Sequence, residues 1–115
     1  MATSYDLNIV QGSQTTVRFT VKDDNGAYLN LSGYSLRGSV KHRYSDTGIL
    51  LNLSPSGVSG YLHQGLIQVK FTTEETKNLP IIQGVYDIEI FSGGYVEKIV
   101  GGYINIFPEV TTNSL

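Results

Sequence analysis

The sequence predicts an all-β fold, an antiparallel β-sandwich of seven to nine short strands. Apolar and polar residues alternate with a period of two along most segments, as they do in strands that bury one face. Clusters rich in glycine separate these segments at short intervals, which is typical of hairpin turns and short loops. The segments do not alternate with long helical patterns, so two antiparallel sheets are favoured over a parallel α/β fold.

The first clear strand is predicted over residues 14–22. Val17, Phe19 and Val21 share one face with Thr15, and the intervening positions carry threonine, arginine and lysine. Only one strand register keeps this apolar set away from water. The Asp-Asp-Asn-Gly sequence that follows at 23–26 predicts a tight turn, and residues 27–31 are expected to return as a short strand.

The alternation resumes over residues 35–43, where Leu36 and Val40 lie opposite Arg37 and Lys41. Turn signals then delimit five further strand segments. These are residues 49–54, 66–71, 85–91, 95–100 and 103–107. Among the turns that separate them we expect Pro55-Ser56-Gly57, Gly93-Gly94 and Gly101-Gly102 to reverse or bend the chain.

At most one short helical turn is predicted, near residues 73–79. Thr72 or Thr73 can cap it, Glu74 and Glu75 suit the positive end of a first turn, and Pro80 stops it. Many short strands with only one such turn favour a sandwich of the immunoglobulin-like style over a barrel.

Composition is consistent with one domain spanning residues 1–115, with a short polar C-terminal arm from about residue 108. The chain has no cysteine, so disulfides, thiolate metal sites and thiol nucleophiles are excluded. A net charge of −2 with scattered basic residues argues against nucleic acid as a partner. The sequence has no apolar run of about 20 residues and no signal peptide, so we expect no membrane association and synthesis in a cytoplasm.

Three carboxylates, Asp87, Glu89 and Glu97, lie close together in the sequence, and paired acids are what glycoside hydrolysis needs. A two-residue Gly93-Gly94 loop would place Lys98 opposite Glu89, whereas a three-residue loop would place Glu97 there. The sequence leaves both registers open. A solvated strand face is favoured over catalysis, because alternating acids are ordinary on a half-exposed strand.

Metal and nucleophile motifs are not evident either. The only two histidines, His42 and His63, lie in different predicted elements and lack zinc-ligand spacing. No serine-nucleophile elbow, phosphate-binding loop or dinucleotide-binding glycine pattern occurs. We therefore predict no catalytic residue, no metal and no cofactor.

Eight tyrosines and no tryptophan suggest a protein interface, a carbohydrate platform or ordinary strand packing. Val85, Tyr86 and Ile88 are expected in the core, Ile90 and Val96 are further candidates for packing, and most tyrosines are expected simply to pack. Those near turns or strand ends are the candidate interface residues: Tyr28, Tyr44, Tyr61, Tyr95 and Tyr103. Carbohydrate binding is the less favoured alternative, because sugar-binding faces usually use tryptophan as well.

Short motifs occur in a characteristic order from Leu7 to Thr111. They are Gln-Gly near the start, a turn with glycine before Leu-Ser-Gly-Tyr, Lys-His-Arg closing the next strand, Thr-Lys-Asn-Leu-Pro, Tyr-Asp-Ile-Glu and a final Glu-Val-Thr. Together they resemble a family of small β-sandwich proteins and domains of tailed bacteriophages and prophages.

This resemblance implies a virion structural protein without enzymatic activity, similar to immunoglobulin-like domains of phage tails and baseplates. Decoration of the head is the alternative location. The expected partners are other virion proteins and further copies of this chain, and the expected site of the protein is the virion. The interactions would be contacts between proteins.

Overall fold

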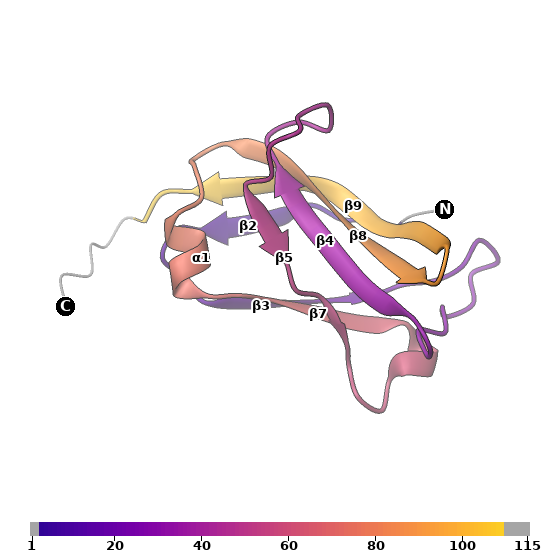
Figure 1. The fold of residues 1–115 in the computed structure, drawn as a ribbon. Helices are drawn as coiled ribbons and strands as arrows, with labels where there is room; N and C mark the ends of the chain where they lie inside the picture. Colours follow the sequence, from indigo (N-terminus) through magenta and orange to yellow (C-terminus); the bar gives the residue numbers. More distant parts are fainter. Residues whose placement is uncertain (1–2, 110–115) are drawn as a thin grey trace.

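A computed structural model describes residues 3–109 (Figure 1). Its elements, in chain order, are β1 (Thr3–Ser4), β2 (Leu7–Val10), β3 (Thr15–Thr20), β4 (Ser35–Lys41), β5 (Leu51–Leu53), β6 (Ser56–Gly57), η1 (Leu62–Gln64), β7 (Leu66–Phe71), α1 (Thr73–Lys77), β8 (Gln83–Ser92) and β9 (Tyr95–Phe107). Strands therefore dominate, as the period-two pattern predicts.

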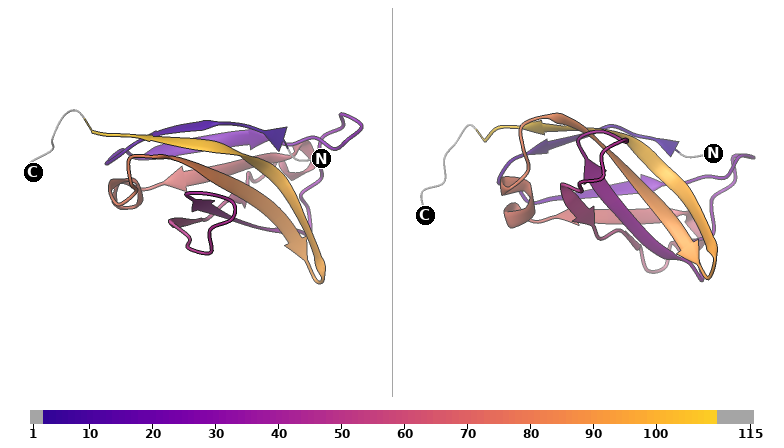
Figure 2. Two further views of the ribbon diagram at one scale, coloured as in Figure 1. Left: turned by 90° about the horizontal axis from the view of Figure 1, so that it is seen from above. Right: turned by 45° about the horizontal axis from the view of Figure 1, so that its top comes forward.

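The strands form two sheets packed face to face (Figures 1 and 2). The larger sheet has the order β1-β9-β8-β4-β5, with β2 also paired to β9, and the smaller sheet has the order β3-β7-β6. This division of the strands between two sheets is that of an immunoglobulin-like sandwich. The predicted fold class is confirmed.

The N-terminal segment pairs within its own domain, at one edge of the larger sheet. Both β1 and β2 run parallel to β9, with Leu7 opposite Ile104 and Ile9 opposite Ile106. The sequence pattern did not predict this parallel edge on an otherwise antiparallel sheet. Leu7 and Ile9 are both buried, so their side chains fix the segment on the sandwich.

The core lies between the two sheets and is built from alternating strand residues. Phe19 and Ile67 face inward from the smaller sheet, and Val40, Ile88 and Ile104 face inward from the larger one. The predicted core positions Val85, Tyr86 and Ile88 are all buried. The expectation that Val96 packs in the core is wrong: it lies opposite Phe91 near the end of the β8–β9 hairpin and is half exposed.

The return strand expected over residues 27–31 does not form. Only an isolated bridge joins Lys22 to Tyr28. The Asp23 carboxylate accepts hydrogen bonds from the main-chain N–H groups of Asn25 and Ala27, at 2.9 and 3.0 Å. These bonds close the turn, while the main-chain bonds beyond it are limited to Asp23 with Ala27 and Leu29 with Val21, too few for a strand.

The turn or bend expected at Gly101-Gly102 is also wrong, because β9 runs through both glycines as one strand of 13 residues. A bulge opposite Ile88 and Glu89 bends the strand just before them. Both glycines allow close approach instead. A Cβ on Gly101 would meet the end of the Lys98 side chain, and one on Gly102 would meet the main chain of Tyr5.

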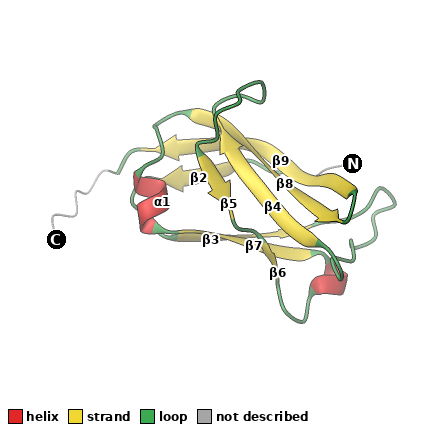
Figure 3. Cartoon of the chain, in the orientation of Figure 1, coloured by secondary structure: helices red, strands yellow, loops and turns green. Residues whose placement is uncertain are grey.

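Two short elements complete the fold (Figure 3). The helical turn is confirmed as α1, and it is closed by a capping box in which Thr72 and Glu75 exchange side-chain and main-chain hydrogen bonds. The 3₁₀ turn η1 was not predicted. The turn expected at residues 55–57 instead contains the two-residue strand β6.

Pro108 and Glu109, at the start of the predicted C-terminal arm, are exposed, and the rest of that arm lies outside the described residues. Within residues 3–109, no helix combines the length and the apolar character needed to cross a membrane.

Candidate interaction surface

Seven of the eight tyrosines are exposed, with 39% to 56% of their surface accessible, and only Tyr86 is buried. Most tyrosines are expected simply to pack, but Tyr86 alone is buried in the core. The five candidate interface residues are all in the exposed group: Tyr28, Tyr44, Tyr61, Tyr95 and Tyr103. They do not form one patch: three come from separate loops, Tyr95 begins β9, and Tyr103 lies within β9.

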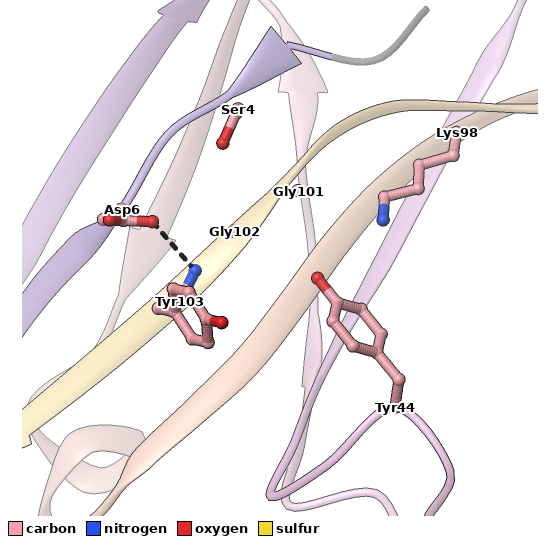
Figure 4. A pocket seen from close by; sticks show the side chains of 7 residues that line it. All are labelled: Ser4, Asp6, Tyr44, Lys98, Gly101, Gly102 and Tyr103. Carbon is pink, nitrogen blue, oxygen red and sulfur yellow. Dashed lines mark hydrogen bonds between the residues drawn. The ribbon is translucent and has the colours of Figure 1, made fainter.

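Tyr44 and Tyr103 are the two candidates that the fold brings together. They line a hollow of about 390 Å³ (Figure 4). Tyr103 is exposed and its neighbour Ile104 is buried, so the hollow lies on the face of the larger sheet that is turned away from the smaller sheet. Tyr44 comes from the loop between β4 and β5, and Tyr103 comes from β9. The remaining lining residues are Ser4, Asp6, Lys98, Gly101 and Gly102.

Ser4 and Asp6 form the N-terminal wall of this hollow, and Asp6 holds it in place. Asp6 lies in the short interruption between β1 and β2, where the parallel ladder to β9 is not continuous. Its Oδ1 atom accepts a hydrogen bond of 3.0 Å from the main-chain N–H of Tyr103, as Figure 4 shows. The carboxylate therefore satisfies a strand N–H at the gap in the ladder.

Lys98 and Tyr44 form the opposite side. The ammonium nitrogen of Lys98 lies 4.9 Å from the centre of the Tyr44 ring, which is within cation–π range. The Lys98 side chain extends over Gly101, where any Cβ would obstruct it. The missing side chain at Gly101 therefore gives the Lys98 side chain room to lie across β9 at the floor of the hollow.

The other candidate tyrosines make separate contacts. The ammonium nitrogen of Lys22 lies 5.4 Å from the centre of the Tyr28 ring. Tyr95, beside the β8–β9 turn, packs against the Tyr34 ring with centroids 5.9 Å apart. Its hydroxyl donates to the carboxylate of Glu97, and this hydrogen bond raises the pKa of the Tyr95 phenol. Tyr61 precedes η1 and is exposed.

The β8–β9 hairpin has the register with a two-residue Gly93-Gly94 loop, so Glu89 lies opposite Lys98. Glu97 lies opposite Ile90. Since successive strand residues point to opposite faces, Glu97 is on the other side of the sheet from Asp87 and Glu89. The fold does not bring the three acids together.

Glu89 is paired with Arg37 rather than with Lys98. Arg37 Nε lies 2.5 Å from Glu89 Oε1, and the guanidinium carbon lies 4.6 Å from the centre of the Phe91 ring. Arg37 and Glu89 border a second hollow of about 350 Å³ that Asp87 also lines. An exposed ion pair of this kind contributes little stability, so it defines surface geometry more than it holds the fold together.

His42 and His63 are both exposed. Among residues 3–109, no group of three or more histidine, aspartate or glutamate side chains is arranged to hold a metal ion.

Tyr86 links the core to the N-terminal wall of the hollow. Its ring is buried against Phe19, with centroids 6.3 Å apart, and its hydroxyl donates to the main-chain oxygen of Tyr5. Burial, followed by the negative charge of Asp6, raises the pKa of the Tyr86 phenol. The neutral, hydrogen-bonding form is therefore favoured in the folded protein.

Sequence reasoning identified Tyr44 and Tyr103 but missed Asp6 as their neighbour. Asp6 and Tyr103 are separated by 97 positions, and no local pattern indicates that they meet. The only available signal was a charged residue just before the apolar alternation of Leu7 and Ile9.

A scan against protein-family models finds no match to this chain, and a search of curated proteins finds no relative.

Proposed function

We propose that this chain is a non-enzymatic structural protein of a bacteriophage virion, associated with the tail or baseplate, that acts by docking onto other proteins. The observation that carries the proposal is the exposure of every tyrosine except Tyr86. Tyrosine is enriched at protein interfaces because its ring buries apolar area while its hydroxyl finds a polar partner. The order of motifs that resembles phage sandwich proteins supplies the context.

The distribution of the exposed aromatic residues supports contacts with more than one neighbour. Tyr28, Tyr61 and Tyr95 belong to different connections, and Val10 and Phe107 form an exposed apolar pair where β2 and β9 end. A standard interface buries about 1,600 Å² in total and depends on a few well-packed anchors. Several small aromatic anchors on a rigid sandwich suit a component held between neighbours in an ordered particle.

A non-catalytic role is supported by the site geometry. Glu97 is on the opposite face of the sheet from Asp87 and Glu89, and Glu89 is held by Arg37. Glycoside hydrolysis needs two carboxyl groups flanking one bond. The three acids do not offer that arrangement together.

Purified particles of the phage that encodes this chain provide the direct test. Mass spectrometry of mature virions is expected to detect the protein at a fixed number of copies per particle, and its absence would refute the proposal. A particle reconstruction would then distinguish the tail or baseplate from head decoration.

Docking through tyrosine anchors is tested by measuring how much of each variant protein is incorporated into phage particles. Alanine variants of Tyr28, Tyr61 and Tyr95 are compared with Thr16→Ala, an exposed position on β3. At least one tyrosine variant is expected to lower incorporation by about tenfold, because single anchors often carry more than 1 kcal/mol of an interface. Equal incorporation of all four variants would contradict tyrosine-mediated docking.

A further inference from the structure

The hollow bounded by Tyr44 and Tyr103 has the dimensions of a ligand site. Its volume of about 390 Å³ falls within the range of roughly 300–1,000 Å³ that is usual for small-molecule pockets. Three separate parts of the chain build it: the β1–β2 segment, the β4–β5 loop and β9. We propose that this hollow binds a neutral saccharide.

Its polar groups match a ligand that both donates and accepts hydrogen bonds. Asp6 offers a carboxylate, Lys98 an ammonium group, and Ser4, Tyr44 and Tyr103 offer hydroxyls. Within residues 3–109 the Ser4 hydroxyl has no hydrogen-bond partner, and Asp6 uses only Oδ1, toward the Tyr103 N–H. Sugar hydroxyls can satisfy both kinds of group.

The balance of charge does not favour an ionic ligand. The formal charges of Asp6 and Lys98 cancel, so an anionic group drawn to Lys98 would also face Asp6, a cationic group drawn to Asp6 would also face Lys98, and neither gains from the net charge of the hollow. An apolar ligand would bury these polar groups without partners, which is unfavourable. A neutral saccharide avoids both penalties.

The tyrosines supply the apolar part of the recognition. Tyr103 is 52% exposed and Tyr44 is 56% exposed, so ring surface is available to the C–H groups of a sugar. One side of the Tyr44 ring is already occupied by the Lys98 ammonium, which leaves Tyr103 as the main stacking residue. Gly101 gives the Lys98 side chain room to lie over β9, where its ammonium group can donate to a sugar hydroxyl.

The experiment uses the full chain and two sets of printed oligosaccharides. One set is neutral and built from glucose, galactose, mannose and N-acetylglucosamine, and the other carries sulfate or sialic acid. The strongest neutral binder is then titrated by calorimetry and by ¹⁵N–¹H NMR. We expect binding from the neutral set, with amide shifts centred on Gly101 and Gly102. Failure of every neutral oligosaccharide to bind would overturn the proposal, as would uniform preference for the charged set.

Variants locate the site. Tyr103→Ala is expected to weaken binding by about tenfold or more, as for other exposed aromatic anchors, whereas Tyr103→Phe retains most of the affinity. Gly101→Val, which places a side chain under Lys98, is also expected to weaken it. Tyr61→Ala, a comparably exposed tyrosine outside the hollow, serves as the matched control.

Equal loss of affinity in Tyr61→Ala and Tyr103→Ala would overturn the assignment of the site. Should a hollow variant be poorly folded, the amide shifts of the unmodified protein decide the matter, because shifts remote from β9 would also overturn it. Particle incorporation is measured separately, so a failure of sugar binding leaves the docking proposal to its own test.

Discussion

The hydrogen bond from Tyr86 to the main chain of Tyr5 is expected to hold the N-terminal segment onto the sandwich. Tyr86→Phe removes only the hydroxyl from a side chain that is 1% exposed. The Tyr5 carbonyl then loses its partner, and the expected cost is about 1–2 kcal/mol of unfolding free energy. For a domain of about 100 residues this lowers the melting temperature by roughly 5–15 °C.

Chemical and thermal denaturation of the two proteins measure this difference. Tyr95→Phe is the matched control, since its hydroxyl also donates a hydrogen bond but lies on an exposed side chain. Its expected effect is within about 0.5 kcal/mol. If Tyr86→Phe were as stable as the parent, or no less stable than Tyr95→Phe, the tethering role assigned to Tyr86 would be refuted.

The pH dependence gives an independent check on the same residue. The folded-state pKa of Tyr86 is raised above its ordinary value of 10. Its contribution is therefore fully present below pH 10 and is lost as the pH rises above 10, because the unfolded chain releases the phenolic proton first. The parent should lose up to about 1.4 kcal/mol per pH unit there relative to Tyr86→Phe. A stability difference that stays constant through this range would argue against a buried neutral phenol.

Three further predictions concern the fold, and denaturant unfolding measures each of them. Gly65 and Gly26 both have positive φ, at 65° and 82°, but only at Gly65 would a Cβ collide with main-chain oxygens. Alanine at Gly26 should cost about 1–2 kcal/mol and alanine at Gly65 clearly more, so equal costs would contradict the close approach. Thr72→Ala should cost about 0.5–2 kcal/mol through loss of the capping box, and no loss would mean that α1 does not depend on its cap. Ile88→Ala should cost about 2–5 kcal/mol, whereas Glu89→Gln on the same strand should cost less than about 1 kcal/mol; the reverse order would mean that the strand faces are assigned wrongly.

The sequence by itself determined the class of the fold and most of its strands. The alternation around Phe19, Val40 and Ile88 has a period that only strands produce, and one register buries these side chains. The capping residues of α1 are local as well, so Thr72 and Glu75 could be read directly. Local patterns report local geometry, and this is why these predictions are confirmed.

Tertiary structure decided the features that depend on contacts between distant segments. Gly101 and Gly102 have the composition of a turn, yet they continue a strand because Lys98 and Tyr5 pack where side chains would otherwise be. The hairpin register was open in the sequence, and the fold fixes Glu89 opposite Lys98.

The candidate site was likewise predicted only in part from the sequence. Tyr44 and Tyr103 could be identified as exposed aromatic residues near turns, but their meeting depends on the β4–β5 loop lying against β9. Asp6 joins them because the N-terminal strands add in parallel to β9, a pairing that brings together residues 97 positions apart. Residue type and periodicity determined which side chains face solvent or core; the packing of distant strands determined which of them meet.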